Sequence, residues 1–169
     1  GSFGAGAGAT VGKIAGFERA MHSGAGSFAI HFEDGLVISA LVVVNALGDV
    51  VDPASGRLVA GVRRTGALEL ADARLLMRDR LPPVGLEGAN TTIGVIATNA
   101  RLTKAQANKV AQMAQDGLAR IIYPSHTPWD GDTLFALATG AWDGEVDLTQ
   151  IGALSADVVA ESVLRAARS

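Results

Sequence analysis

Residues 27–46 read SFAIHFEDGLVISALVVVNA, two apolar runs joined by the dipeptide Asp34-Gly35. An Asp-Gly pair between two such runs is a strong signal for a β-hairpin with a type I′ turn. The second run, residues 36–46, is apolar on both faces until Asn45. A strand of this kind is typical of the centre of a sheet that is covered on both faces. The hairpin therefore predicts a sheet buried between layers.

Outward from the hairpin, helical and strand patterns alternate along the chain. In order, they predict helices over 11–22 and 66–80, a strand over 90–98, a helix from Thr103 to about Gln115, a strand over 133–139 and a helix capped by Ser155. The helix at Thr103 has the clearest start, because Thr103 and Gln106 form a capping box. The last helix is expected to bury Val158, Val159, Ser162, Val163 and Ala166. The fold class is therefore α/β.

The composition excludes several classes of protein. A chain of 169 residues is expected to form one domain. It has no cysteine and only 3 scattered histidines, so disulfides, thiolate chemistry and metal catalysis are not expected. The net charge is −3 without a basic run, which argues against nucleic-acid binding. The longest apolar run, residues 36–46, is too short to span a bilayer. We expect a cytoplasmic protein with no cofactor and no membrane association.

The first candidate site is the glycine-rich segment 1–10 with Lys13 behind it. A phosphate-binding loop needs Ser or Thr after its lysine, but Ile14 stands there, and Ala7 occupies the place of the first glycine. The segment is therefore either a nucleotide- or anion-binding module or a tight backbone that lets a helix pack closely. Lys13 is unexpected at the start of a helix, because the helix dipole disfavours a cation there.

The second candidate is the junction that follows residues 81–89, a stretch with two prolines and two glycines. Such a stretch is expected to be an exposed linker. Thr91 comes next, after Asn90, at the start of a strand. An N-terminal threonine can act as a nucleophile with its own α-amine as base, once the chain is cut before it. The alternative is a loop that enters a strand beginning with threonine.

Two further candidates are polar residues at the ends of strands. Asp130 and Asp132 precede the strand over 133–139, where paired carboxylates can bond to a nucleophile or shift each other's pKa. Asn45 ends the central strand and could donate a hydrogen bond to an oxyanion. The alternatives are an Asp-rich turn and an asparagine that satisfies a neighbouring loop.

Four ordered blocks together resemble a known family. They are GAGAGATVGK over 4–13, VNALGD over 44–49, NTTIGV over 90–95 and HTPWDGDTLFALATG over 126–140. The blocks are similar to those of the DmpA-like, self-processing N-terminal-nucleophile hydrolases. The Asn-Thr junction resembles the branch that cuts 6-aminohexanoate (nylon-6) oligomers. Aminopeptidases that act on D-residues and β-peptides are near relatives of that branch.

The resemblance implies a role for each candidate residue. Thr91 would be the nucleophile, freed by autocleavage between Asn90 and Thr91, and its α-amine would be the general base. Lys13 and Asn45 would orient the nucleophile and stabilise the oxyanion. The two aspartates would hydrogen-bond near Thr91 and promote both self-cleavage and turnover.

The resemblance also implies an architecture, a four-layer αββα sandwich assembled as a tetramer of processed protomers. Residues 1–90 would be the C-terminal part of the α-chain, and residues 91–169 would be the β-chain. Together they would form one domain that lacks the N-terminal part of the precursor. That N-terminal segment would then be the partner that covers the exposed sheet.

The expected activity is hydrolysis of linear amide bonds in 6-aminohexanoate oligomers. Three alternatives stay open. The first is an aminopeptidase or amidase for β- or D-amino-acid peptides, and the second is the nucleotide- or anion-binding module. The third is an inactive fragment or assembly subunit.

Overall fold

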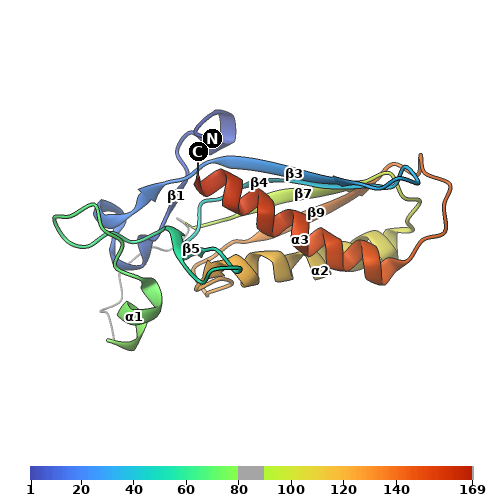
Figure 1. Ribbon diagram of the computed structural model, residues 1–169. Helices are drawn as coiled ribbons and strands as arrows, with labels where there is room; N and C mark the ends of the chain where they lie inside the picture. The colour runs from blue at the N-terminus through green and yellow to red at the C-terminus, as the bar shows by residue number, and fades with distance from the viewer. Residues whose placement is uncertain (80–89, 169) are drawn as a thin grey trace.

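The centre of the protein is a four-stranded sheet with two long helices on one face (Figure 1). The computed structural model describes residues 1–79 and 90–168. The strands, in their order across the sheet, are β3 (Ala25–His31), β4 (Val37–Val43), β7 (Ile93–Thr98) and β9 (Thr133–Ala138). The helices are α2 (Lys104–Ile121) and α3 (Leu148–Ala167). The chain is therefore α/β, as the sequence predicts.

Strand pairing makes β4 the inner strand that the sequence predicts. β4 pairs antiparallel with β3 and β7, and β9 joins β7 in parallel. A parallel pair needs a crossover connection, and α2 provides it between β7 and β9. Alternate side chains of β4, those of Ile38, Ala40 and Val42, are buried with the apolar residues of α2 and α3. The core therefore lies between the sheet and these two helices.

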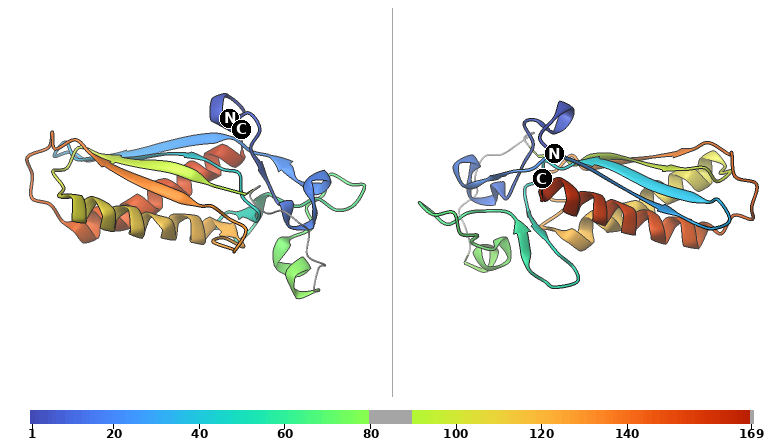
Figure 2. Two further views of the ribbon diagram at one scale, coloured as in Figure 1. Left: turned by 180° about the vertical axis from the view of Figure 1, so that it is seen from behind. Right: turned by 45° about the horizontal axis from the view of Figure 1, so that its top comes forward.

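The opposite face of the sheet carries no helix among the described residues (Figure 2). Leu41 of β4 is 50% exposed there, and Phe135 of β9 is 63% exposed. Ile93 and Leu137 are exposed on the same face. The predicted cover on both faces of the central strand is thus wrong for this part of the chain. An apolar surface of this kind marks an interaction site.

The hairpin between β3 and β4 is confirmed, but its turn is not of type I′. The Gly35 N–H donates to the Phe32 carbonyl at 3.0 Å, and Gly35 alone in the loop has a positive φ, of 87°. A type I′ turn needs positive φ at both central residues. The loop is therefore one residue longer than predicted, with glycine at its single left-handed position.

The predicted helix over 11–22 is wrong. Short strands β1 (Thr10–Val11) and β2 (Met21–His22) pair with each other, and the 3-10 turns η2 (Lys13–Ala15) and η3 (Phe17–Arg19) lie between them. A further 3-10 turn, η1 (Gly4–Gly6), precedes them. Gly12 and Gly16 have φ of 72° and 102°, which no α-helix accommodates. The apolar spacing was helical, but two glycines interrupt the backbone.

The predicted helix boundaries also need correction. α1 (Ala73–Arg78) occupies only part of the predicted helix over 66–80. The capping box at Thr103 is confirmed, and α2 continues beyond the predicted end. α3 is capped by Asp147, while Ser155 lies buried within it and donates to the Ile151 carbonyl at 2.7 Å. Ser155 satisfies its hydroxyl one turn back and so has no capping role. The predicted core residues of α3 are buried.

A smaller sheet lies beside the main one. Its order is β6 (Leu58–Ala60), β5 (Asp49–Val51) and β8 (Ile122–Tyr123), and β8 directly follows α2. The predicted linker over 81–89 lies outside the described residues. None of the helices that the structure describes is long and apolar enough to cross a membrane.

Candidate active site

The bond between Asn90 and Thr91 is held between the end of β4 and the loop before β9. The Gly131 N–H donates to the Asn90 carbonyl at 2.9 Å, and Asn90 forms an isolated parallel bridge with Asp130. The Thr91 N–H donates to the Asn45 carbonyl at 2.9 Å. Thr91 Oγ1 itself lies 2.6 Å from the Asn90 carbonyl oxygen. The predicted nucleophile therefore sits against the carbonyl that it would attack.

Lys13 is completely buried and reaches the same place from η2. Its Nζ donates to the Asn45 carbonyl at 3.0 Å and to Asn45 Oδ1 at 2.7 Å. Burial lowers the pKa of Lys13 to about 8, while the nearby Asp130 carboxylate opposes the shift. Gly12 places the lysine, because it has a positive φ and a Cβ there would overlap Val62. Lys13 lies in a 3-10 turn, so the conflict expected with a helix dipole does not arise.

Asn45 connects the lysine to the threonine. It follows β4, on the open face of the sheet, and its Oδ1 accepts from Lys13 and from the Thr10 N–H at 3.2 Å. Its carbonyl oxygen accepts from both Lys13 and Thr91. Asn45, which is half-buried, therefore belongs to a network that links β1, β4 and the strand start at Thr91.

The two aspartates lie on the other side of the junction. Asp132 Oδ1 accepts from the Thr92 N–H at 2.8 Å. Burial raises the pKa of the Asp132 carboxyl, and the charge of Asp130 adds to this rise, while the Thr92 hydrogen bond opposes it. Asp130 Oδ2 accepts from the N–H and the hydroxyl of Thr127 at 2.9 and 2.7 Å. The structure thus brings all the predicted site residues together around one peptide bond.

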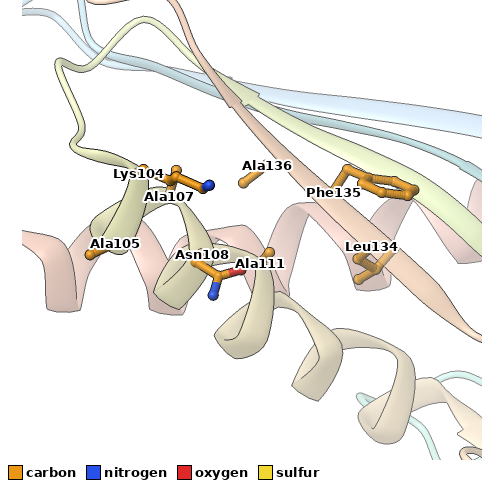
Figure 3. A pocket seen from close by; sticks show the side chains of 8 residues that line it. All are labelled: Lys104, Ala105, Ala107, Asn108, Ala111, Leu134, Phe135 and Ala136. Atoms are coloured by element: carbon orange, nitrogen blue, oxygen red, sulfur yellow. The ribbon is translucent and has the colours of Figure 1, made fainter.

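The glycine-rich segment lies beside this bond. A cleft of about 330 Å³ opens at Asn45 and Thr91. The rest of its lining is small or apolar and consists of Ala5, Gly8, Ala9, Val43 and Ile93. A larger groove of about 620 Å³ runs between α2 and β9, and its lining includes Lys104 and Asn108 of α2 with Leu134 and Phe135 of β9 (Figure 3). That groove contains none of the predicted site residues. Within the described residues, no three His, Asp or Glu side chains are grouped to hold a metal ion.

Two residues of the site were missed by sequence reasoning. His126 Nδ1 lies 3.3 Å from Asp132 Oδ2, and Gly131 supplies the N–H at the Asn90 carbonyl. Both lie in the HTPWDGD segment that carried the resemblance. Their positions within that segment, next to the aspartates, were the only available signal, because neither periodicity nor composition marks them.

The buried carboxylate of Asp49 holds together the segments next to Lys13. Asp49 opens β5, and its two oxygens accept the Val62 N–H at 2.8 Å and the Ala73 N–H, at the start of α1, at 2.6 Å. The Gly48 carbonyl next to it accepts the N–H of Gly12 at 2.8 Å. Asp49 therefore fixes the segments on which Lys13 rests.

Asp49 is expected to make stability fall as the pH rises. Burial raises its pKa from 3.8 to about 6, more than the hydrogen bonds from Ala73 and Val62 lower it. The native state therefore holds this proton more tightly than the unfolded state, and its contribution is complete below about pH 4 and lost above about pH 6. The difference between these two pKa values corresponds to roughly 3 kcal/mol.

Urea unfolding between pH 4.5 and 7.5 tests this expectation. The stability of Asp49→Asn relative to the wild type is expected to improve by roughly 2 kcal/mol across this range, which begins above the pH where the wild-type contribution is complete. Asp116→Asn, on the exposed side of α2, is the matched control and should follow the wild type at every pH. Parallel curves for wild type and Asp49→Asn would contradict the prediction.

The fold matches solved structures of one class. The L-aminopeptidase D-Ala-esterase/amidase of Ochrobactrum anthropi, described as a variant of the Ntn hydrolase fold, aligns with 98% of this chain and 44% of its own. Its TM-score is 0.62 at 20% identity. A β-aminopeptidase of Burkholderia sp. aligns with 98% of this chain and 45% of its own, with a TM-score of 0.64 at 21% identity. The described residues therefore have part of an N-terminal-nucleophile hydrolase fold.

The chain belongs to peptidase family S58, whose model matches residues 1–168. It is 39% identical to an uncharacterized aminopeptidase of Mycobacterium leprae, over 97% of this chain and 47% of that protein. It is also 35% identical to a 6-aminohexanoate-oligomer endohydrolase of Kocuria sp., over 99% of this chain and 50% of that protein. The chain thus spans about half the length of the curated relatives it matches.

Proposed function

We propose that the protein is a self-processing amide hydrolase whose nucleophile is Thr91, released by cleavage of the Asn90–Thr91 bond. One observation carries the proposal. Thr91 Oγ1 lies 2.6 Å from the Asn90 carbonyl oxygen, and the Gly131 N–H donates to that same oxygen at 2.9 Å. The hydroxyl thus lies beside the carbonyl that self-cleavage would attack, and the N–H at its oxygen can stabilise the oxyanion of acyl transfer.

In the proposed self-cleavage, Thr91 Oγ1 forms a bond to the carbonyl carbon of Asn90. The charge that develops on the carbonyl oxygen is stabilised by the Gly131 N–H. The bond from this carbon to the Thr91 nitrogen then breaks, and the hydroxyl proton ends on that nitrogen. Water hydrolyses the resulting ester, so that Asn90 carries the new carboxylate and Thr91 a free α-amine.

Turnover follows the same chemistry on an external amide. The α-amine of Thr91 takes the hydroxyl proton, and Oγ1 forms a bond to the amide carbon. The bond from that carbon to the amide nitrogen then breaks, and the α-ammonium group gives the proton to the leaving amine. Water then hydrolyses the ester on Thr91. Lys13 and Asn45 lie where they can orient the nucleophile and stabilise the oxyanion, with Nζ 2.7 Å from Asn45 Oδ1. Asp130 and Asp132 hold the strand start from the other side.

As substrate we propose linear amides of 6-aminohexanoate oligomers. The small and apolar lining of the cleft at Thr91 suits an uncharged aliphatic chain, and the Kocuria endohydrolase is 35% identical. The second candidate is an aminopeptidase for β- or D-amino-acid peptides. The greater identity, 39%, to the uncharacterized aminopeptidase of Mycobacterium leprae favours aminopeptidase activity without indicating the kind of peptide.

We further propose that residues 1–90 and 91–169 are the parts of two chains made by this cut, within a four-layer αββα protomer. The open face of the main sheet, with Leu41 and Phe135 exposed, supports the addition of further layers by another segment of the same precursor. The solved structures, of which this chain matches less than half, also support it. A tetramer of processed protomers is the proposed assembly.

The test is the intact mass of the denatured complete gene product, with N-terminal sequencing of every chain present. Two chains, one of which begins at Thr91, are expected. Purified protein would then be assayed on 6-aminohexanoate oligomers and on β- and D-amino-acid peptides. A single uncut chain that hydrolyses none of them would overturn the proposal and favour an inactive assembly subunit. Cleavage of the peptides alone would favour the aminopeptidase.

A further inference from the structure

Two adjacent residues of the loop before β9 hold the two aspartates of the site. His126 Nδ1 lies 3.3 Å from Asp132 Oδ2, and the His126 backbone N–H also hydrogen-bonds the Asp132 carboxylate. Thr127 binds Asp130 through its N–H and its hydroxyl. The proposed mechanism assigns roles to the aspartates but none to the histidine beside them.

The backbone at His126 is strained in a way that serves this contact. Its φ is 53°, in the left-handed region that non-glycine residues rarely adopt. Such strain persists only where the surroundings impose it, and it is frequent at functional sites. At His126 this conformation directs both the ring and the backbone N–H of one residue to the same carboxylate. The histidine side chain is 40% exposed, whereas that of Asp132 is only 5% exposed.

The Asp132 carboxylate connects His126 to the strand start that follows the Asn90–Thr91 bond. While Oδ2 of Asp132 faces His126, its Oδ1 accepts the Thr92 N–H at 2.8 Å. Thr92 is the residue after the nucleophile, so the orientation of this carboxylate fixes where the strand begins. A carboxylate with only one anchored oxygen can rotate about its χ2 angle, which is a soft torsion. Two anchored oxygens remove that freedom.

We propose that His126 is a positioning residue, whose Nδ1–H fixes the Asp132 carboxylate and thereby holds Thr91 against the Asn90 carbonyl. The charged groups that face this carboxylate are His126 itself and Asp130, with Lys13 beside Asp130. Asp130 repels Asp132, so a donor at Oδ2 also offsets the proximity of two carboxylates. The inference rests on the proposed self-cleavage.

The experiment compares two substitutions at His126 in the complete gene product, with the rate of self-cleavage followed by mass. His126→Gly removes the side chain, and glycine adopts a positive φ without strain. His126→Asn keeps an N–H donor on a nitrogen bonded to Cγ, as Nδ1 is in histidine, and asparagine tolerates the left-handed conformation. We expect His126→Gly to slow self-cleavage by about 10- to 100-fold, the scale of a small misplacement of reacting groups. His126→Asn should restore most of the rate.

The controls are His22→Asn and His31→Asn, which change exposed histidines elsewhere and should cut at the wild-type rate. Urea midpoints of all variants separate slow cutting from poor folding. A wild-type rate in His126→Gly would overturn the inference, and so would an asparagine variant as slow as the glycine one. A wild-type protein that stays uncut would overturn the proposed function and this inference with it, whereas the other two results leave the proposed function in place.

Discussion

Thr91→Ala is expected to leave the protein as a single uncut chain and to reduce amide hydrolysis to background. The substitution removes Oγ1, which lies 2.6 Å from the Asn90 carbonyl oxygen. Without that oxygen, neither the ester with Asn90 nor the ester with substrate can form. Loss of a catalytic nucleophile typically costs several orders of magnitude in rate. Mass spectrometry of the denatured protein and an oligomer hydrolysis assay provide the two readouts.

The neighbouring threonine supplies a matched control. Thr92 is fully buried, and its hydroxyl makes no hydrogen bond within the described part of the chain. Thr92→Val conserves its shape and removes only that hydroxyl, so this variant should cut and hydrolyse like the wild type. A Thr91→Ala protein that still appears as two chains would show that another group makes the cut. Hydrolysis retained by that variant would remove Thr91 from the mechanism.

The four strands of the main sheet follow from the sequence because strand signals are local. The Asp34-Gly35 dipeptide between two apolar runs predicted the hairpin, whereas the open face of its second strand was not predicted, because that strand is apolar on both faces. The helix over 11–22 failed for an equally local reason. Its apolar spacing was right, but the positive φ of Gly12 and Gly16 converts the segment into two 3-10 turns. Periodicity reports only the pattern of side chains, whereas the conformation of this segment is determined by the backbone dihedral angles of its glycines.

The site shows the opposite behaviour, because its contacts join segments that are far apart in the chain. The hydrogen bond between Lys13 and Asn45 joins residues 32 positions apart in the chain, and that between Thr92 and Asp132 joins residues 40 positions apart. No propensity or spacing rule predicts contacts between residues so far apart in the chain. These residues were therefore assigned to one site only through the resemblance of four sequence blocks. Residues that act through a backbone atom, such as Gly131, carry no chemical signal in their side chain at all.

Gly131→Ala is expected to slow self-cleavage by about 100-fold, the second largest effect after loss of the nucleophile. A Cβ on residue 131 would lie 2.7 Å from Thr91 Oγ1, closer than such atoms approach one another. Either the hydroxyl or the Gly131 N–H must therefore move away from the Asn90 carbonyl, and both are needed there. Gly131 does not have a positive φ, so alanine suits its backbone and the substitution tests the contact alone.

Gly8→Ala is the matched control, because Gly8 lines the same cleft and a Cβ there would meet no atom within 4 Å. This variant should cut at the wild-type rate, so that a general effect of glycine replacement near the site is excluded. The rate would be followed by the appearance of the chain beginning at Thr91 after synthesis of the precursor. Equal rates for Gly131→Ala and Gly8→Ala would contradict the prediction, because the added Cβ would then displace neither the Thr91 hydroxyl nor the Gly131 N–H from the Asn90 carbonyl. Slow cutting by Gly131→Ala alone would show that self-cleavage depends on the close approach of residue 131 to Thr91, by which an exposed loop between two aspartates acts on a bond 40 positions earlier in the chain.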